Sequence, residues 1–316
     1  MTKKRIVVII PCYNEGEALL HTVKALTEVR KKVTKYQLDI LFINDGSADN
    51  TQEIIEDAAQ KHDFIFYRQF SQNAGQQSAL RAGLNAATDY DAAIMMDADM
   101  QHPPKLIPDM IAEWEAGFKV IQMVRDDGGQ KPGLLKYMLS RGFYVALNTV
   151  SDLNLEYGSS DFRLIDKSVI ETVACSKERK LFLRGYFSWL PVSRTTIEYK
   201  PNERVAGVPK YTFKMSLDLA SKGILQFSEK PLRLAMGLGV FFAVTSFLYG
   251  LALTILYLVG GVHAVSGWTS LMVAVLFCFG INFILLGIIG SYLAHSIGVQ
   301  KERPEFIIAK QKLRGF

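Results

Sequence analysis

The feature that most constrains this chain is a long stretch without formal charge, because residues 234–300 contain no Asp, Glu, Lys or Arg. A helix needs about 20 apolar residues to cross a bilayer, so this stretch can supply two spans joined by a turn. The glycine-containing segment 260–267 fits the turn, and we predict transmembrane helices over 234–259 and 268–292. The alternative is a buried hairpin of a large soluble protein, but soluble core helices rarely extend this far without a charge on one face.

Basic residues on both sides of the uncharged stretch set its predicted orientation. Lys222, Lys230 and Arg233 precede it, further basic residues follow it, and the predicted turn carries no charge. By the positive-inside rule, both ends of the helical pair then lie in the cytoplasm of a multi-pass protein of the cell membrane. This organisation adds an amphipathic juxtamembrane helix at 212–233 and a basic cytoplasmic tail at 293–316. We therefore attribute the net charge of +5 to basic residues that face the membrane, and no nucleic-acid partner is required to explain it.

Composition excludes several other classes of protein. With 49% hydrophobic and 21% charged residues, the chain is not of the disordered type. The three cysteines, Cys12, Cys175 and Cys278, are too far apart in the sequence to indicate a disulfide framework or a zinc cluster. The N-terminal apolar run at 6–10 is too short for the hydrophobic core of a signal peptide, and we interpret it as a buried strand.

Residues 1–211 alternate between strand-like and helix-like patterns, which predicts one cytoplasmic α/β domain. Short continuous apolar runs, typical of strands buried on both faces, are separated by amphipathic segments. This order predicts a Rossmann-like, mostly parallel sheet covered by helices, and such sheets bind ligands at the carboxyl ends of their strands. The predicted strands are 6–10, 38–43, 64–67, 92–96 and 119–124, and the predicted helices are 17–31, 51–61, 78–87 and one that begins at 102.

The signatures of several nucleotide-dependent and metal-dependent enzymes are absent. No G-x-G-x-x-G follows the first strand, and the chain contains neither G-x-x-x-x-G-K-[ST] nor H-E-x-x-H. The sequence therefore gives little support to a dinucleotide-dependent dehydrogenase, a P-loop NTPase or a zinc protease of that type.

Acidic side chains follow the predicted strands instead. Asp97 and Asp99 come directly after the fourth strand, and two carboxylates at positions i and i+2 of an extended segment face the same way. Such a pair can hold a hard divalent cation that is shared with substrate phosphates, although a solvated turn also produces it. Gln101 lies just before two prolines that set the start of the next helix. We interpret His102 as a capping or packing residue rather than a metal ligand.

Four ordered motifs resemble those of an inverting GT-A glycosyltransferase of family 2. They are Pro11-x-Tyr13-Asn14-Glu15, Asp45-Gly46-Ser47-x-Asp49, Asn73-x-Gly75-x-x-x-Ala79-x-x-x-Gly83 and Asp97-x-Asp99-x-Gln101-His102-Pro103-Pro104. Together with the paired C-terminal spans, the resemblance covers essentially the whole chain and narrows to the polyprenyl-phosphate glycosyltransferases. That group includes bactoprenol glucosyltransferase and dolichyl-phosphate mannose synthase. One departure is Asn44, where many family members have a second Asp.

The resemblance implies a nucleotide pocket at the ends of the first two strands. Pro11, Tyr13 and Glu15 would line the pocket for the base, and Asp45 would bind the base or the ribose. Because Pro, Asn, Asp and Gly also form ordinary turns, simple turn chemistry is the alternative for these positions.

The resemblance also implies a divalent cation beside the nucleotide. Asp97 would contact the nucleotide-sugar, and Asp97, Asp99 and Gln101 would hold Mg²⁺ or Mn²⁺ against the donor diphosphate. Displacement of a nucleoside diphosphate builds negative charge on the leaving group, which a bound cation stabilises.

The segment 158–164 resembles the one that carries the family's proposed base, which makes Asp161 the candidate. The acceptor implied by the resemblance is a phosphate monoester with a second pKa of about 6, so it is already largely ionised near neutral pH. Asp161 therefore either removes a proton or orients the acceptor or the sugar. The structural alternative is an aspartate that caps a local turn.

An anionic lipid acceptor requires cations near the membrane surface. The resemblance points to Arg125, Arg141 and Lys210 as partners of the lipid phosphate, and each of them could equally be a solvated or headgroup-facing charge. Arg141 and Lys210 belong to or adjoin segments with a broad apolar face, which are suited to lie in the membrane interface. Such helices could also support self-association of the chain into a homo-oligomer.

The sequence thus predicts an integral-membrane enzyme that transfers a sugar from a UDP-sugar donor to polyprenyl (undecaprenyl) phosphate with inversion. Glucose and N-acetylglucosamine are the favoured sugars by resemblance, and no residue decides between them. Two alternatives stay open. One is a processive family-2 polysaccharide synthase, although the Gln-x-x-Arg-Trp motif of those enzymes is absent. The other is a catalytically silent relative that binds the lipid carrier or anchors a partner.

Overall fold

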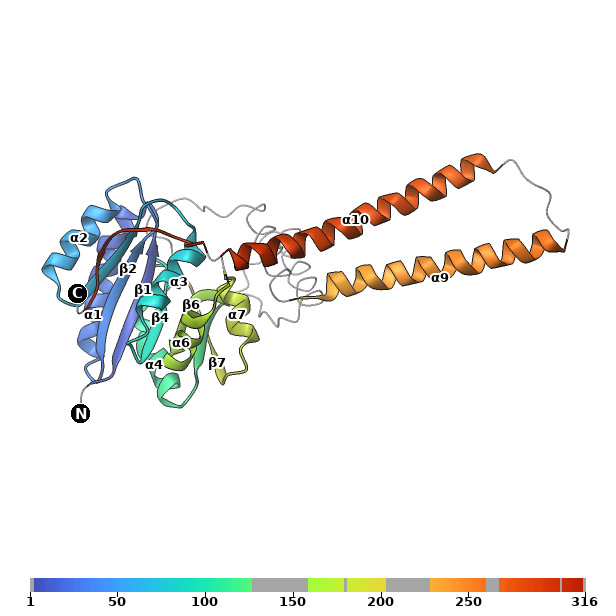
Figure 1. Ribbon diagram of the computed structural model, residues 1–316. Helices are drawn as coiled ribbons and strands as arrows, with labels where there is room; N and C mark the ends of the chain where they lie inside the picture. Colours follow the sequence, from blue (N-terminus) through green and yellow to red (C-terminus); the bar gives the residue numbers. More distant parts are fainter. Residues whose placement is uncertain are drawn as a thin grey trace.

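The computed structural model describes residues 3–126, 159–178, 181–202, 228–259, 267–301 and 303–314. Figure 1 shows an α/β domain from which two long helices project in the same direction. The domain is built around an eight-stranded sheet with the strand order β7-β5-β6-β4-β1-β2-β3-β8. The strands are β1 (Arg5–Cys12), β2 (Gln37–Asn44), β3 (Ile65–Phe70), β4 (Ala92–Met95), β5 (Val120–Arg125), β6 (Ser159–Asp166), β7 (Arg194–Tyr199) and β8 (Ile308–Lys312).

The sheet is mostly parallel, which confirms the fold class predicted from the sequence. Strands β1 to β4 run in one direction, and β5 and β7 follow it, whereas β6 and β8 run antiparallel to their neighbours. The helices of the domain are α1 (Gly16–Lys32), α2 (Thr51–Lys61), α3 (Gln76–Ala86), the 3₁₀ turn η1 (Pro104–Leu106), α4 (Ile107–Glu115), α6 (Lys167–Cys175) and α7 (Leu183–Trp189).

Both faces of the sheet are apolar and covered by helices. Along β1, Ile6, Val8 and Ile10 point into the core beneath α1, α2 and α4, whereas Val7 and Ile9 point into the core beneath α3, α6 and α7. Since successive side chains of a strand face opposite sides, a strand buried on both faces must be a continuous apolar run. This explains why the periodicity of the sequence located the central strands.

Each strand and helix predicted within the first 126 residues is present, and with one exception its ends differ from the predicted ones by at most three residues. The helix predicted to begin at 102 starts with η1 at Pro104, and α4 itself begins at Ile107. The later part of the domain contains elements that the sequence analysis did not predict, namely β6, β7, β8, α6 and α7. These are short or partly polar segments, and β6 contains Asp161, Arg163 and Asp166 among its apolar residues. Such a strand lacks the continuous apolar run used to find the others. Of the predicted juxtamembrane helix at 212–233, residues 212–227 lie outside the described part of the chain.

The two projecting helices are α9 (Lys230–Leu258) and α10 (Trp268–Gln300). Each contains a segment long and apolar enough to cross a membrane, Lys230–Tyr249 in α9 and Phe277–Gln300 in α10. Most of the large apolar side chains that the structure describes in these helices are exposed, and Phe247 and Phe283 are 71% and 70% exposed. A helix that exposes large apolar side chains all round is unstable in water, so these two helices require an apolar environment.

After α10 the chain returns to the α/β domain and crosses it as an extended segment, residues 303–314, which we call the C-terminal strap (Figure 1). Its strand β8 pairs antiparallel with β3, and the ring of Phe306 stacks on that of Phe70 with centroids 4.7 Å apart. Near its end, Arg314 forms an ion pair with Asp39, a fully buried carboxylate of β2. The sequence indicated only a basic tail here, since β8 is a short segment of two apolar residues followed by three polar ones and does not show the pattern of a buried strand.

Candidate active site

The carboxyl ends of β1, β2 and β4 lie at one edge of the sheet and bring together acidic residues from distant parts of the sequence. Cys12 at the end of β1 pairs with Asn44 at the end of β2, and Ile9 pairs with Met95 of β4. The residues that follow these strands therefore emerge side by side. The antiparallel strand β6 brings one more acid, because its pairing of Arg163 with Met95 places Asp161 beside the chain that leaves β4.

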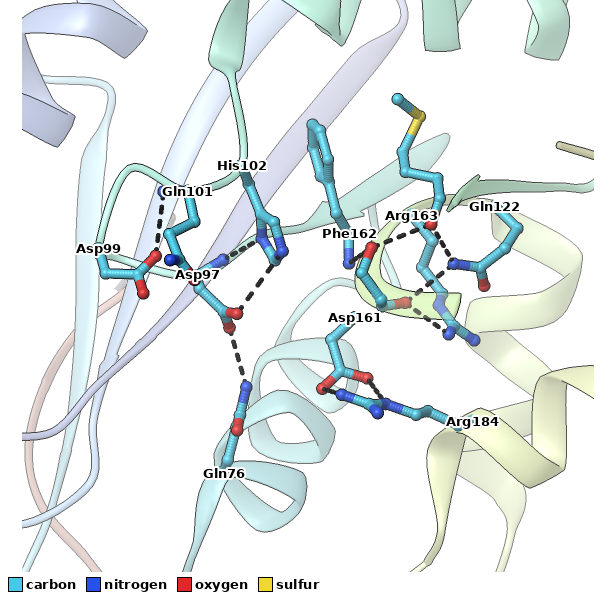
Figure 2. Close-up of polar contacts among 12 residues, drawn as sticks. Gln76, Asp97, Asp99, Gln101, His102, Gln122, Asp161, Phe162, Arg163 and Arg184 are labelled. Carbon is cyan, nitrogen blue, oxygen red and sulfur yellow. Dashed lines mark hydrogen bonds and ion pairs between the residues drawn. The ribbon is translucent and has the colours of Figure 1, made fainter. Parts of the chain in front are cut away.

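Asp97 lies at the centre of this edge. Its Oδ1 accepts a hydrogen bond of 2.8 Å from Nε2 of Gln76, the first residue of α3. Figure 2 shows the Asp97 and Asp161 carboxylates directed toward the same space, with Gln76 on one side of it and Arg184 on the other. Burial raises the pKa of Asp97, and the negative charges of Asp161 and Asp99 add to this shift. A cation beside Asp97 would relieve the repulsion within this group of carboxylates.

His102 organises the segment that follows Asp97. Its Nδ1 accepts a hydrogen bond of 2.9 Å from the backbone N–H of Asp97, and its ring stacks on Phe162 with centroids 5.0 Å apart. Tyr199 contacts the same ring edge-on. The histidine is 5% exposed, so the prediction that it packs is confirmed by its contacts.

Asp99 and Gln101 belong to a tight turn whose middle residue, Met100, has a left-handed backbone with φ of 65°. Such a conformation costs a non-glycine residue about 1–2 kcal/mol and persists only where neighbours hold it. Oδ1 of Asp99 accepts a hydrogen bond of 3.1 Å from the backbone N–H of Gln101. Asn202, which follows β7, donates from Nδ2 to the Met100 carbonyl and from its backbone N–H to the Gln101 carbonyl, at 3.2 and 3.3 Å.

The donor set of this turn suits a hard divalent cation. Two carboxylates and an amide provide oxygen ligands, and Mg²⁺ is usually bound by one or two carboxylates together with substrate phosphates. Among the described residues, no group of three or more His, Cys, Asp or Glu side chains is gathered as a closed metal site. Binding of a cation by Asp97, Asp99 and Gln101 therefore stays a prediction, which requires further ligands from outside the protein.

Asp161 forms a two-point ion pair with Arg184 of α7. Nε and Nη2 of Arg184 donate to Oδ1 and Oδ2 of Asp161 at 2.7 and 2.8 Å, and the aspartate is 3% exposed (Figure 2). Burial alone would raise the pKa of Asp161, but the Arg184 guanidinium outweighs burial and lowers the pKa to about 2. The carboxylate is thus ionised throughout the neutral range and is a weak base. The sequence analysis missed Arg184, because nothing in the sequence indicates that α7 packs beside β6.

A second arginine, Arg163, lies on β6 beneath this ion pair. It is 1% exposed, donates from Nη2 to the Ser160 carbonyl at 2.9 Å, and places its guanidinium over the ring of Phe187, 4.9 Å from the centroid. Burial lowers its pKa to about 10. The guanidinium therefore remains charged at neutral pH and adds positive potential behind Asp161.

Asp45, predicted to contact the base or ribose, is 3% exposed and holds the loop before α3. Oδ1 accepts from the backbone N–H of Ala74 at 2.7 Å, and Oδ2 accepts from the backbone N–H of Gly75 and from Nδ2 of Asn73 at 2.9 and 3.0 Å. Gly46 has φ of 67° and lies so close to this loop that an added Cβ would approach the Gln72 carbonyl carbon to 2.6 Å. The Asp-Gly and Asn-x-Gly motifs thus form one joint, and a nucleotide contact by Asp45 stays a prediction.

Replacement of Asp45 by alanine is expected to leave the Ala74 and Gly75 amides without partners and to lower the stability of the domain by about 2 kcal/mol. Asp45→Asn should cost less, since its amide oxygen can still accept one of the three hydrogen bonds. Thermal unfolding of both variants in detergent, followed by circular dichroism, measures the difference. A melting temperature of Asp45→Ala equal to that of the wild type would contradict the assigned role.

The predicted base pocket follows β1. Pro11 is partly buried in the strand, and Tyr13 is 39% exposed. The next residue, Asn14, has a left-handed backbone and is tied to the segment after β2, since its N–H donates to Ser47 Oγ at 3.0 Å. The N–H of Glu15 donates to Thr51 Oγ1 at 3.0 Å. The loops after β1 and β2 therefore form one surface, on which Tyr13 projects.

Of the three predicted lipid-phosphate residues, Arg125 is the one that the structure describes. It ends β5 and is exposed at the carboxyl edge that also carries Asp97. Arg141 and Lys210 lie outside the described residues.

Residues 7–174 match the family described as glycosyl transferase family 2. The chain is 37% identical over 308 residues to the bactoprenol glucosyl transferase of Shigella phage SfV, covering 98% of this chain and 99% of that protein. It is 35% identical over 308 residues to a prophage bactoprenol glucosyl transferase homolog of Escherichia coli K12, with 98% and 99% coverage. Among solved structures, it is similar to the mannosyltransferase PcManGT of Pyrobaculum calidifontis in complex with GDP-Man and Mn²⁺, at 13% identity, with 96% and 89% coverage and a TM-score of 0.46.

The family match extends over strands β1 to β6 and helix α6, and so includes the edge where Asp97, Asp99 and Asp161 meet. The match over nearly the full length of the relatives also includes α9, α10 and the C-terminal strap. With its mostly parallel sheet of the GT-A type, this chain belongs to glycosyl transferase family 2.

Proposed function

We propose that this chain transfers a sugar from a UDP-sugar to polyprenyl (undecaprenyl) phosphate at the cytoplasmic face of the membrane. The product would be a polyprenyl monophosphosugar formed with inversion at the sugar carbon. The observation that carries the proposal is the meeting of Asp97, Asp99 and Asp161 at one sheet edge in a chain that also exposes two long apolar helices. A lipid-linked acceptor explains why an α/β transferase would carry such helices.

On this proposal the donor diphosphate lies beside the turn that contains Asp99 and Gln101. When bound, Mg²⁺ or Mn²⁺ would neutralise the charge that develops on the leaving diphosphate. Asp97, fixed by Gln76 and by the backbone contact to His102, and Asp99, fixed by the Gln101 N–H, would hold that cation. Tyr13 and Glu15 would line the base pocket with Pro11, and the joint formed by Asp45 would shape its floor.

Asp161 would act by orienting the acceptor or the sugar. Its pKa of about 2 makes it a poor proton acceptor at neutral pH, and a phosphate monoester with a second pKa of about 6 requires no base to become a nucleophile. Arg184 would hold the carboxylate in place through its two hydrogen bonds. Arg125, with Arg141 and Lys210, would provide positive charge for the acceptor phosphate.

The names of the bacterial and phage relatives favour glucose as the sugar, with N-acetylglucosamine as the second choice. Helices α9 and α10 would span the membrane, with the start of α9 and the end of α10 both in the cytoplasm. Basic residues flank these two ends, whereas the segment that connects the helices carries no charge. The catalytic edge would then share a compartment with soluble nucleotide-sugars.

A transfer assay with the full-length chain in detergent tests the proposal. Radiolabelled UDP-glucose, UDP-N-acetylglucosamine and GDP-mannose are each incubated with undecaprenyl phosphate and Mn²⁺, and the label that passes into the organic phase is counted. We expect label from one UDP-sugar, loss of that label with EDTA, and none when undecaprenol replaces its phosphate. Label that stays in an aqueous polymer would indicate a processive synthase, and no transfer from any donor would contradict the proposal.

A further inference from the structure

The C-terminal strap reaches the donor side of the domain through one buried acid, Glu305. Oε1 of Glu305 accepts a hydrogen bond of 2.7 Å from Ser78 Oγ, and Oε2 lies 3.2 Å from Nη1 of Arg81. The side chains of Glu305 and Arg81 are 8% and 10% exposed. This contact is therefore a buried, charged one, unlike the exposed pair of Lys310 and Glu56 farther along the strap.

Arg81 is fixed from a second side. Its guanidinium also donates to the backbone carbonyls of Ser176 and Glu178, which follow α6. Glu305 thus forms an ion pair with a buried guanidinium, and its loss would remove that pair, although the Glu178 carboxylate also interacts electrostatically with Arg81. The contact fixes one face of α3 relative to the strap and to the chain after α6.

Helix α3 carries the residues that hold the donor site. Gln76, its first residue, donates to Asp97, and the loop just before it is held by Asp45 through the amides of Ala74 and Gly75. Ser78 lies between the C-terminal strap and the loop before α3. Its Oγ contacts Glu305 and also lies 3.0 Å from the Ala74 carbonyl.

The same first turn of α3 touches the other half of the site. Oε1 of Gln77 accepts a hydrogen bond of 3.2 Å from the backbone N–H of Leu183. Leu183 begins α7 and precedes Arg184, the partner of Asp161. A shift of α3 would therefore change the positions of both the Asp97 and the Asp161 carboxylates.

We propose that Glu305 is a positioning residue for the donor site and links the end of α10 to it through the first turn of α3. This inference rests on the proposed function, because the donor is the ligand whose binding it would control. Glu305 lies only five residues beyond Gln300, the last residue of α10, so the strap has little slack between the helix and the buried contact. The contact of Glu305 with Ser78 and Arg81 would then couple the orientation of α10 to the geometry around Asp97.

The test compares Glu305→Ala and Glu305→Gln with the matched control Lys310→Gln, which removes an exposed ion pair from the same strap. Hydrogen exchange of the ligand-free full-length chain in detergent is measured first. We expect faster exchange of the Ala74 and Gly75 amides in Glu305→Ala, a smaller increase in Glu305→Gln, which keeps an oxygen for Ser78, and wild-type exchange in the control. Exchange unchanged in a folded Glu305→Ala chain would overturn the link.

Binding of UDP with Mn²⁺, measured by titration calorimetry, is the second readout. We expect Glu305→Ala to raise the Kd by about three- to tenfold, with the KM for undecaprenyl phosphate unchanged. A Kd equal to that of the wild type would overturn the positioning role. Failure of the wild type itself to bind UDP would contradict the proposed function, and hydrogen exchange would still decide whether Glu305 holds the loop.

A further variant, which we expect to fold normally, keeps the proposal testable if Glu305→Ala does not fold. Ser78→Ala removes the hydroxyl that donates to Glu305 and lies near the Ala74 carbonyl. It leaves the ion pair of Glu305 with Arg81 in place, and alanine is the best helix former. It should raise the Kd for UDP in the same direction as Glu305→Gln. No change in both Kd and exchange for Ser78→Ala and Glu305→Gln would also overturn the proposal.

Discussion

Replacement of Asp99 by alanine is expected to lower sugar transfer by about 100- to 1,000-fold. On the proposed function, Asp99 provides an oxygen ligand to the cation that stabilises the leaving diphosphate, and its carboxylate also accepts the Gln101 N–H that shapes the turn. Both contributions are lost in the variant. Initial rates measured over a range of Mn²⁺ concentrations should show a reduced maximal rate and a weaker apparent affinity for the metal.

Asp109→Ala is the matched control for this experiment, because Asp109 is an exposed aspartate in the first turn of α4, outside the turn that contains Asp99. It should retain transfer within about twofold of the wild type. Transfer by Asp99→Ala that equals the control, or that continues in EDTA, would refute the assignment of the cation to this turn.

Replacement of Arg184 by glutamine is expected to lower transfer at pH 7 by about 10- to 100-fold and to move the acidic limb of the pH profile upward. In the wild type, Arg184 holds the pKa of Asp161 at about 2. Asp161 is then ionised at every working pH, and the acidic limb reports the acceptor phosphate near pH 6. Without Arg184, burial is opposed only by the charges of Arg163 and His102 and the pKa of Asp161 rises, so its protonation adds to the loss of activity as the pH falls.

The sign of the effect on stability follows from the same ion pair. A carboxylate whose pKa is lower in the folded state stabilises the fold above its unfolded pKa of about 3.9, and this contribution is lost as the pH falls through about 2. The wild type should thus keep the contribution of Asp161 at pH 5. In Arg184→Gln the raised pKa makes the folded state bind more protons than the unfolded state, so the variant should be less destabilised at pH 5 than at pH 7. Thermal unfolding at the two pH values measures this difference.

Two further variants serve as controls for Arg184→Gln. Asp161→Asn has no titrating group at this position, so its acidic limb should return to that of the acceptor phosphate although its rate is low. Arg194→Gln removes an exposed arginine of β7 that donates to the backbone carbonyls of Ser188 and Leu190, and it should keep the wild-type profile. A wild-type rate and limb for Arg184→Gln would show that the ion pair has no part in transfer.

The parts of the fold that the sequence predicted share one physical property. Strands β1 to β4 are continuous apolar runs because both of their faces are covered, and the two projecting helices contain no Asp, Glu, Lys or Arg between residues 234 and 300. Each of these patterns is local and complete within one segment. Asp97 and Asp99 could be found for the same reason, since their position directly after a buried strand is enough to place them at the sheet edge.

The parts that were missed depend on pairings between distant segments. Strand β6 is partly polar, and its place between β4 and β5 follows only from tertiary packing. Without that placement, the 23-residue separation of Asp161 and Arg184 carries no sign of an ion pair. Asp45 illustrates a second limit, because the motif identified the residue, whereas its three hydrogen bonds to the loop before α3 became visible only in the structure.

The antiparallel pairing of β8 with β3 has a consequence for biosynthesis. Without β8, strand β3 would be an open edge of the sheet, and an open edge invites pairing with other chains. The ribosome makes β8 only after both projecting helices, so the nascent domain keeps this edge unprotected while the hairpin is being made. The edge of β3 is therefore covered only after α9 and α10 have been synthesised. Chains that stop before residue 308 should aggregate or be degraded rather than accumulate as soluble transferase domains.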